Sequence, residues 1–485
     1  MAAACGAFHT HAVSEEGELW GWGSGSDAQL GLATPAASED PARRHRRRPA
    51  RDGGPELFGA RVVSIACGRL HAAAVAADGG LWTWGHNTEG QLGHGDEQPR
   101  ARPARLQSIG PSPVVHASCG SCHTLALAQD GTVWTWGEGV WGQLGKGDTA
   151  NCSVPAKLAP ERFGGERAVV LAAGSSHSVA VTELGGVCTW GYGGDGCLGH
   201  GDEFSRYVPT RLARFGPRVV LAAAGDSHTV CVGEDGALWA WGWGALGQLG
   251  LGDNAGRLEP ARVGGGDDTF GGSRVLLAAC GENHTLCVGE DGTLWSCGSG
   301  AFGRLGHGDG DEGDRLVPCR IAGRHFGGKR VVTAAAGVAH STALTEDGRL
   351  YTWGRGYSYP GSPNGLGHGD VEHRFVPTLV SPHNWHGARL GRCQPLPPQH
   401  ALAFAMGTHS RLGAALPGGG GSRQSQRRRG KPADESAGGC LYSSMPKELV
   451  QRVIEACVSW PEGSVGSMDG LVRLLGGGKV TRGSG

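Results

Sequence analysis

A sevenfold internal repeat constrains this chain more than any other feature. The repeat unit is clearest in CGENHTLCVGEDGTLWSCGSGAFGRLGHGD, which runs from Cys280 to Asp309. Its first glycine recurs 51 to 62 residues apart, at Gly6, Gly68, Gly120, Gly174, Gly225, Gly281 and Gly337. Helical solenoids repeat at about 33 to 47 residues, whereas four-stranded propeller blades take about 40 to 50. The period therefore favours a series of four-stranded blades.

Each unit contains the pattern of a β-hairpin. The apolar runs HTLCVG and TLWSCG flank Asp291-Gly292, and an Asp-Gly pair between β-prone runs is a strong hairpin signal. The second run ends in a large ring followed by glycine, which fits the close packing of one blade on the next. This place is filled by Trp22, Trp84, Trp136, Trp190, Trp241 and Trp353, and by Cys297 in the sixth unit.

Two further strands complete the unit. The third is expected to open at a proline such as Pro103, because proline cannot donate to a strand ladder. In the first unit, Pro41 is aligned with Pro103. The fourth strand is the apolar run that leads into the next unit, for example RVVSIACG at 61–68.

The submotifs GxxH[TS], LxxWG, GQLG and GHGD, in that order, resemble the regulator of chromosome condensation repeats. The resemblance covers Cys5 to about Arg411. It implies an all-β fold, a seven-bladed β-propeller of four-stranded blades. Because the chain begins inside a unit, the apolar run Ala401–Met406 is expected to be a last fourth strand that pairs beside Cys5 to Ala12 and closes the ring.

Composition changes after the repeats and indicates three regions. Residues 1–411 form the propeller. Residues 412–440 are a flexible linker, whose basic run includes Arg427, Arg428 and Arg429. Residues 441–485 are a short helical tail, because Met445, Leu449 and other apolar residues recur at helical spacing. So short a tail cannot bury much core alone.

Composition and charge also limit the class of protein. Glycine makes up 90 of 485 residues, which the turns of seven blades explain, and a net charge of -1 argues against nucleic-acid binding by bulk charge. No run approaches the roughly 18 apolar residues that span a membrane, and no signal peptide precedes the first strand. We expect an intracellular protein without membrane contact, and the sequence does not choose between cytoplasm and nucleus. Several of the 15 cysteines occupy one repeat position that alanine fills elsewhere, and they are interpreted as small buried side chains: Cys5, Cys67, Cys119 and Cys280.

The recurring histidines are expected to be structural. One per unit, they are His9, His71, His123, His177, His228, His284 and His340. Spread around a ring, they favour hydrogen bonding before the first strand rather than one metal centre. The CxxCH sequence at Cys119–His123 matches haem attachment, but it is also the repeat's own CGxxH. Neither a metal nor a cofactor is therefore predicted.

The two variable residues of GxxH line one face near the propeller axis in the family that the repeats resemble. Here they include Arg69, Asp226 and Glu282. Ultraviolet-B receptors of that family carry Trp and Arg at these places. This chain has no Trp and one Arg there, which disfavours a photoreceptor. No nucleophile and base pair stands out either, so catalytic residues are not assigned.

Insertions at the first and seventh units indicate a partner-binding surface, because loops on a rigid scaffold carry function. Units one and seven are neighbours in a closed ring, and their insertions define a seam patch. Its residues are Arg43, Arg44, Arg46, Arg47, Arg48, Arg51, Tyr357, Tyr359, Trp385, Arg389 and Arg392.

Three functions are consistent with these observations. The first is a non-enzymatic scaffold for protein–protein interaction, since the fold is clear and no catalytic set is present. The second is a guanine nucleotide exchange factor for a small GTPase, which the resemblance implies as the founding activity of the family. The third is a substrate-recruiting component of a ubiquitin ligase, because GRLGHGD at Gly303–Asp309 resembles the propellers of large ligases. Arginine-rich loops also allow phosphate or nucleic-acid contact.

Overall fold

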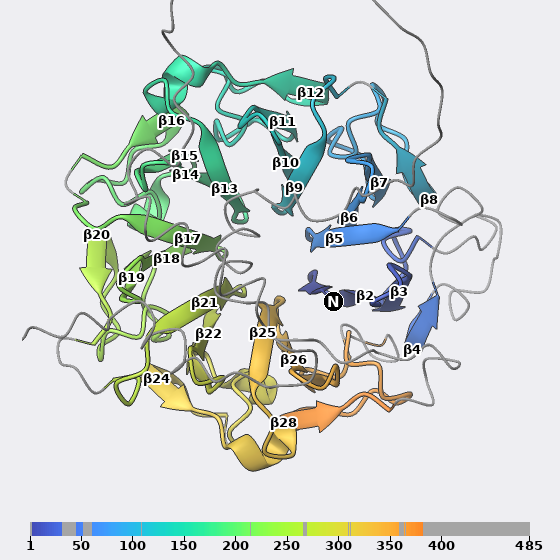
Figure 1. The fold of residues 1–485 in the computed structure, drawn as a ribbon, viewed down its shortest axis with the longest axis vertical. Coiled ribbons are helices and arrows are strands. Elements are labelled where there is room, and N and C mark those ends of the chain that lie inside the picture. Colours follow the sequence, from blue (N-terminus) through green and yellow to red (C-terminus); the bar gives the residue numbers. More distant parts are fainter. Residues whose placement is uncertain are drawn as a thin grey trace, which may run out of the picture. The chain divides into compact units, whose positions relative to one another are not determined.

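The structure, a computed structural model, describes residues 2–31, 45–51, 61–107, 109–213, 215–264, 269–308, 310, 312–357, 363 and 365–381. These residues belong to the compact unit Met1–Ala414. They form seven antiparallel sheets of four strands each, arranged as blades around one axis (Figure 1). The seven-bladed all-β propeller is therefore confirmed. The predicted linker and helical tail, 412–440 and 441–485, lie outside the described residues.

The strands occupy equivalent places in the seven blades. The innermost are β1 (Ala2–Cys5), β5 (Val62–Cys67), β9 (Val114–Cys119), β13 (Ala168–Ala173), β17 (Val219–Ala224), β21 (Val275–Cys280) and β25 (Val331–Ala336). The second are β2 (His9–Val13), β6 (His71–Ala76), β10 (His123–Ala128), β14 (His177–Thr182), β18 (His228–Gly233), β22 (His284–Gly289) and β26 (His340–Thr345). The third are β3 (Leu19–Gly23), β7 (Leu81–Gly85), β11 (Val133–Gly137), β15 (Val187–Gly191), β19 (Leu238–Gly242), β23 (Leu294–Gly298) and β27 (Leu350–Gly354).

The outermost strands carry the prolines. They are β4 (Arg46–Arg51), β8 (Arg100–Arg105), β12 (Cys152–Lys157), β16 (Arg206–Arg211), β20 (Arg257–Arg262), β24 (Arg315–Arg320) and β28 (Arg374–Leu379). Short 3-10 helices lie in the connections, η2 (Pro160–Phe163), η3 (Gly194–Gly196), η4 (Ala301–Gly303) and η5 (Gly323–Phe326). A proline on an outer edge strand costs no ladder hydrogen bond, which explains its place there.

The apolar runs are the innermost strands, so the predicted boundary between blades was wrong by one strand. The run at Val62–Cys67, for instance, pairs with β6 of the following repeat. In blade one this inner place belongs to β1, which pairs with β2 from Ala2↔Val13 to Cys5↔Thr10. The place beside β2 that Ala401–Met406 was expected to fill is therefore occupied. Residues 401–406 themselves lie outside the described residues.

The repeated tryptophans form the packing between blades. Trp241 is fully buried against Val181, Val219 and Leu212, which places it between blades four and five. Its indole Nε1 donates a 2.9 Å hydrogen bond to the Cys197 carbonyl of blade four. The same bond to the preceding blade recurs at Trp22, Trp84, Trp136, Trp190 and Trp353. Each ring therefore contributes both apolar burial and a polar link between blades.

Replacing Trp241 by alanine is expected to lower the free energy of unfolding by about 3 to 5 kcal/mol, because it removes a buried ring and leaves a cavity. Denaturant unfolding of the full chain measures this loss. Trp141, whose side chain is 47% exposed, supplies the matched control, and Trp141→Ala should cost less than about 1 kcal/mol. Equal losses for the two variants would contradict the packing role of Trp241.

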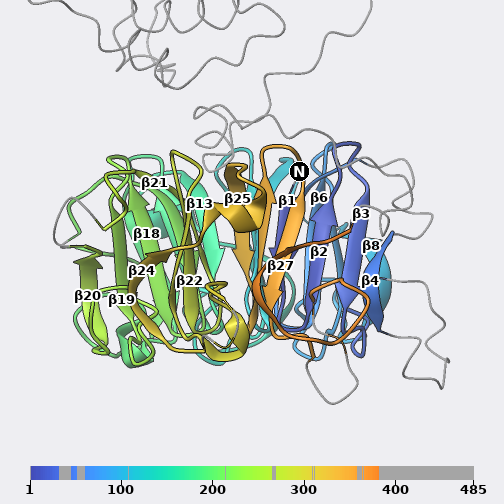
Figure 2. The ribbon, with the colours of Figure 1, turned by 90° about the horizontal axis from the view of Figure 1, so that it is seen from below.

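The strand order places two sets of loops at one end of the propeller. In each meandering blade the connections between strands one and two and between strands three and four emerge at the same end. Figure 2 shows the N-terminus at the opposite, upper end, so β1 runs down toward the turn at 6–8. We call this lower end the GxxH face. It comprises the GxxH turns that begin at Gly6, Gly68, Gly120, Gly174, Gly225, Gly281 and Gly337, together with the third-to-fourth strand loops.

Candidate interaction face

The GxxH turns are held in place by hydrogen bonds between neighbouring blades. His71 Nε2 lies 2.9 Å from the Thr124 hydroxyl, and that hydroxyl donates to the Gln91 carbonyl at 2.9 Å. Since the hydroxyl proton is used there, the Nε2 proton of the histidine is the donor to the hydroxyl oxygen. The same contact joins His123 to Ser178, His177 to Thr229, His228 to Thr285, His284 to Ser341 and His340 to Thr10, at 2.9 to 3.0 Å. The last pair joins blade seven to blade one.

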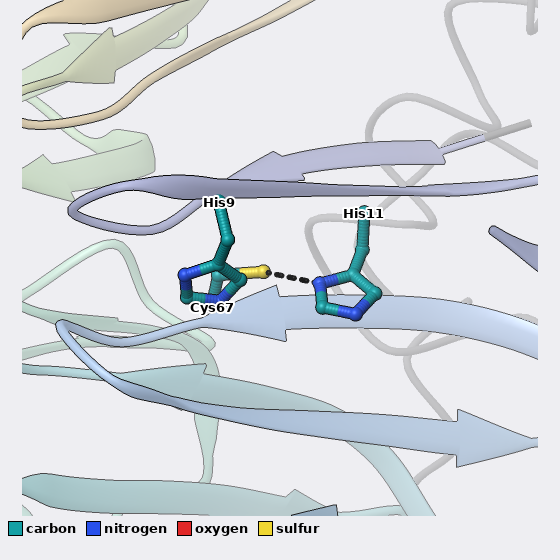
Figure 3. A group of neighbouring side chains, drawn as sticks. All are labelled: His9, His11 and Cys67. Carbon is teal, nitrogen blue, oxygen red and sulfur yellow. Dashed lines mark hydrogen bonds between the residues drawn. The ribbon is translucent and has the colours of Figure 1, made fainter. Parts of the chain in front are cut away.

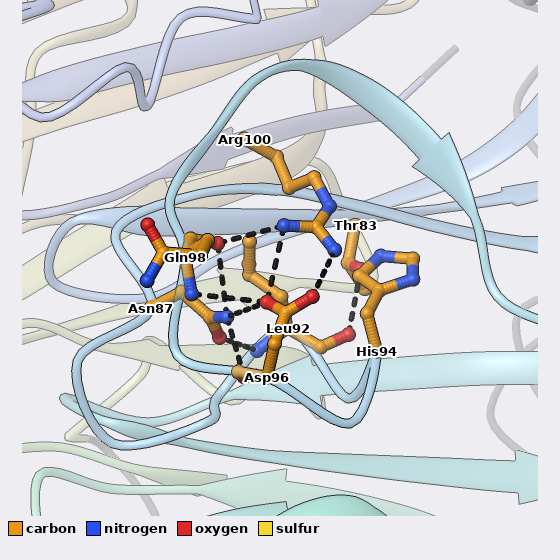
Figure 4. A network of polar contacts seen from close by, with 7 residues as sticks. All are labelled: Thr83, Asn87, Leu92, His94, Asp96, Gln98 and Arg100. Carbon is orange, nitrogen blue, oxygen red and sulfur yellow. Dashed lines mark hydrogen bonds and ion pairs between the residues drawn. The ribbon is translucent and has the colours of Figure 1, made fainter.

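The GHGD loops are fixed by their own polar network (Figure 4). In blade two, Asp96 accepts a 2.7 Å ion pair from Arg100, and Asn87 donates to the Asp96 carbonyl at 2.9 Å. His94 Nε2 lies 3.0 Å from the Thr83 hydroxyl, which donates to the Leu92 carbonyl. Equivalent histidine contacts occur at His200, His307 and His368. These histidines and aspartates thus bond within their loops, which positions the loop backbone.

Charged side chains meet where the GxxH turns approach the axis. Glu282 of blade six is half-buried, and burial together with Asp226 of blade five raises its pKa. Arg304 of blade six and Arg69 of blade two oppose that shift. The charge of Arg69 therefore acts on Glu282, although three blades lie between the two residues in the sequence. We call the group Arg69, Asp226, Glu282 and Arg304 the axial cluster.

Acidic residues extend the axial cluster over the neighbouring blades. Glu138 of blade three has a raised pKa, caused by burial and then by Glu89 of blade two. The pKa of Tyr192 in blade four is raised by burial and by several acids, among them Asp195 and Asp226. Carboxylates thus follow one another on the GxxH face from blade two to blade six. Such a row attracts a positively charged partner.

Arg304 is the residue of the axial cluster that departs most from the repeat. It stands in GRLG where three other units have GQLG, and it is only 6% exposed. Its Nη1 donates to the Val338 carbonyl at 3.1 Å and its Nε to the Ala301 carbonyl at 3.0 Å. Burial lowers the pKa of this guanidinium, and Glu282 partly offsets the shift. The arginine ties the loop of blade six to the GxxH turn of blade seven.

Aromatic rings surround this arginine. The Arg355 guanidinium lies 4.7 Å from the centre of the Phe302 ring, and Arg304 lies 5.7 Å from the same centre. Tyr357 stacks on His373 with ring centres 5.0 Å apart. Phe302 has a φ of 61°, which a side-chain-bearing residue rarely adopts. The Arg355 guanidinium thus lies against two rings, Phe302 and Tyr357, in the loops of blades six and seven.

A second aromatic group lies over blades three and four, and we call it the aromatic rim. Trp141 and Phe204 are 47% and 72% exposed. Trp141 meets Tyr192 edge to face at 5.1 Å, and the neighbouring Gly142 packs against Tyr207. Large exposed rings next to one another commonly mark a protein interaction surface.

The structure divides the predicted seam patch. Arg46, Arg47, Arg48 and Arg51 do not lie in an inserted loop, because they belong to the outermost strand β4. Tyr357 lies on the GxxH face and stacks on the His373 ring. Arg43, Arg44, Tyr359, Trp385, Arg389 and Arg392 lie outside the described residues.

The register of β4 explains this correction. Arg46 lies opposite Gly23 as Arg100 lies opposite Gly85 in blade two. Pro49 is therefore the equivalent of the blade-two proline, and the alignment of Pro41 was wrong. Arg46 and Arg51 are arginines of the repeat itself, whereas the exposed Arg47 and Arg48 stand at variable positions, which Ala101 and Arg102 fill in blade two. Whether the seam patch binds a partner stays a prediction.

The repeats of this chain match models of known protein families. Residues 1–231 match the model of the RCC1-like domain, and 235–288 and 291–344 match the regulator of chromosome condensation (RCC1) repeat. The RCC1 domain-containing protein RUG3, mitochondrial, of Arabidopsis thaliana is 30% identical over 373 residues, which cover 71% of this chain and 80% of that protein. The chain belongs to the RCC1 repeat family.

Other RCC1 repeat proteins show how varied the family is. The Ultraviolet-B receptor UVR8 of Arabidopsis thaliana is 38% identical over 296 residues, 61% of this chain and 65% of that receptor. The chain thus spans slightly less than two thirds of the receptor. Prp20p of Saccharomyces cerevisiae, whose structure was described with its binding to Gsp1p and histones, superposes with a TM-score of 0.65. It is 25% identical, over 76% of this chain and 87% of Prp20p.

Among the described residues, no helix is long and apolar enough to cross a membrane.

Proposed function

We propose that this RCC1 repeat protein is a protein-interaction scaffold without covalent chemistry of its own, and that its partner docks on the GxxH face. The observation that carries the proposal is the aromatic rim beside the row of carboxylates, where the exposed Trp141 meets Tyr192 edge to face at 5.1 Å. Rings supply contact area at low entropic cost, and charges steer a partner and set its orientation.

The chemistry of this face defines the partner. Carboxylates from Glu89 to Glu282 favour a basic protein surface, and the rim favours an apolar side chain next to it. The buried Arg304 is already bonded to backbone carbonyls, so it holds the loops rather than recruiting an acid. A basic, partly apolar protein surface fits these features best.

The double variant Asp226→Asn/Glu282→Gln is expected to weaken binding of a basic protein partner about tenfold at low salt, because it removes two carboxylates from the docking face. Gsp1p and core histones, the proteins named with Prp20p, are the probes, and titration of the immobilised full chain measures the dissociation constant. The effect should shrink as ionic strength rises.

The matched control is Arg47→Ser/Arg48→Ser, which changes two exposed charges on β4 and leaves the row of carboxylates and the aromatic rim intact. It should bind both probes as the wild type does. If this control loses binding while the acidic variant keeps it, the seam patch rather than the GxxH face is the docking surface. If neither probe binds the wild type, the proposed basic partner class is wrong.

A second candidate function is guanine nucleotide exchange on a small GTPase. The similarity to Prp20p over 76% of this chain favours it, together with the family's founding activity. Release of labelled GDP from Gsp1p tests it directly. Acceleration of GDP release by orders of magnitude would establish exchange activity. Binding of Gsp1p without GDP release would support the scaffold function and exclude exchange on this GTPase.

A further inference from the structure

One blade boundary lacks the hydroxyl that every other boundary uses. His9 of blade one is the equivalent of His71, but the next blade places Ala72 where the other blades have Thr or Ser. Both ring nitrogens of His9 are buried, and neither has a hydrogen-bond partner. Its side chain is 0% exposed. A buried polar group in this state costs free energy unless another atom satisfies it.

Two other side chains of metal-binding type lie at the same boundary (Figure 3). His11 follows His9 on β2, and Cys67 ends β5 of blade two. The Cys67 Sγ lies 3.5 Å from His11 Nδ1, and the rings of His9 and His11 meet edge to face at 5.3 Å. One ligand atom from each of the three residues lies within 4.8 Å of the others.

We propose that His9, His11 and Cys67 bind a thiophilic d¹⁰ metal ion, Cu⁺ or Zn²⁺, which clamps blade one to blade two. Two imidazoles and a thiolate are the ligand set that these ions prefer. At Zn–N and Zn–S distances near 2.1 and 2.3 Å, a tetrahedral site separates nitrogen and sulfur by about 3.6 Å. The Cys67–His11 spacing of 3.5 Å already fits, and the His9 nitrogen, within 4.8 Å of the other two ligand atoms, would move closer when a metal ion binds.

Burial and charge favour these ions further. Histidine binds a metal ion through a neutral imidazole nitrogen, and the buried ring of His9 has two nitrogens without a hydrogen-bond partner. Two neutral rings and one thiolate make a neutral complex with Cu⁺, which a buried site accommodates at least cost. Zn²⁺ would leave the complex with one positive charge and would bind a fourth ligand. A water molecule would supply it, because solvent reaches the site at the partly exposed Cys67.

The repeat supplies conservative variants for the test. In Cys67→Ala, the inner strand of blade two ends in alanine. The inner strands of three other blades end in the same residue, for example at Ala336. His11→Val does the same for β2, because valine occupies the equivalent position at Val179. Cys280→Ala is the matched control, since Cys280 ends β21 as Cys67 ends β5 and lies outside the cluster. All three variants keep an apolar side chain that the fold already accepts.

The experiment titrates the reduced full chain with Cu⁺ and with Zn²⁺ against competing chelators. We expect one equivalent of one of the two ions to bind and to raise the melting temperature. Loss of a ligand should weaken metal binding at least about 100-fold, because mutating a residue that only hydrogen-bonds to a ligand already weakens binding by up to that factor. Cys67→Ala and His11→Val should both show this loss, and Cys280→Ala should not. Equal binding by wild type and Cys67→Ala would overturn the site, and so would no binding of either ion.

Ala72→Ser tests the role of His9 while leaving all three ligands in place. The new hydroxyl would give His9 the partner that its six counterparts have. We expect it to raise the melting temperature of the metal-free protein and to weaken metal binding, since the imidazole is then engaged. Unchanged affinity in Ala72→Ser would contradict the assignment of His9 as a ligand.

Discussion

Acidification from pH 7 to pH 5.5 is expected to remove most of the stability of the propeller. Burial lowers the pKa of His71, His123 and His228 to about 3 and that of His177 and His340 to about 4. It lowers the pKa of His9 and His284 well below the ordinary value of 6.5. All seven rings are therefore neutral in the folded protein at mildly acidic pH.

The sign of the effect follows from proton linkage. Between pH 6.5 and the folded pKa, the unfolded chain binds protons that the folded ring excludes, so stability falls as pH falls. Each histidine removes roughly 1 kcal/mol between pH 7 and 5.5. Seven of them together approach the 5 to 15 kcal/mol that stabilises a typical domain. Glu138 and Glu282 act in the opposite direction, because their pKa values are raised.

Urea unfolding across this pH range measures the slope. Carboxylates whose pKa is lowered, such as that of Asp96 beside Arg100, titrate below this window and do not interfere. The variant His228→Gln should reduce the slope by about one proton. A free energy of unfolding that stays constant from pH 7 to 5.5 would show that the rings are accessible to protons in the folded state.

The fold could be predicted because each structural demand recurs seven times. A turn glycine and a GxxH turn in every unit, with a buried tryptophan in six of the seven, leave a propeller as the consistent solution. The blade boundary was harder to place, because a sequence period does not mark where a sheet begins. Only strand pairing shows that Val62–Cys67 belongs with β6 rather than with the strand before it.

The candidate sites lie where the sequence departs from the repeat. Sequence alone identifies some of these departures as candidate site residues and not others. Arg69, Asp226 and Glu282 are variable positions of a known turn, so the sequence could single them out. Arg304 and His11 are equally visible departures, GRLG for GQLG and HTH for HTL, yet their importance depends on neighbours from other blades. The contact between His11 and Cys67 joins residues 56 positions apart, which no local pattern indicates.

The alignment of the first unit failed for a related reason. Its outer strand RRRPAR matches RARPAR of blade two, with Pro49 at the place of Pro103. The run of arginines makes this strand resemble a charged insertion, so the sequence alone favours Pro41 over Pro49 as the proline of the outer strand. Charge alone could not separate a repeat arginine such as Arg46, which lies opposite Gly23 in the ladder, from one at a variable position such as Arg47.

Deleting Ala2–Cys5 is expected to abolish cooperative unfolding or to lower the free energy of unfolding by more than about 4 kcal/mol, above most single-site effects. These residues are the inner strand of blade one, and their loss would expose the edge of β2. They also contact blade seven, since Cys5 Sγ lies 3.7 Å from the Ala335 carbonyl and 3.5 Å from the Thr342 hydroxyl. Calorimetry and urea unfolding of the truncated chain measure the effect.

The comparison that decides how the ring closes is a second deletion, of Ala401–Met406. Because β1 already pairs with β2 over four residues, removing 401–406 should leave the unfolding midpoint unchanged. The opposite result would be a stable chain without residues 2–5 and an unstable chain without 401–406. It would support the expectation that the C-terminal run closes the ring. The Thr10–His340 and Trp22–Gly365 bonds join blades one and seven through side chains. With blade one built entirely from the N-terminal segment, this junction depends on the same contacts as the others, and it needs no strand shared between the chain ends.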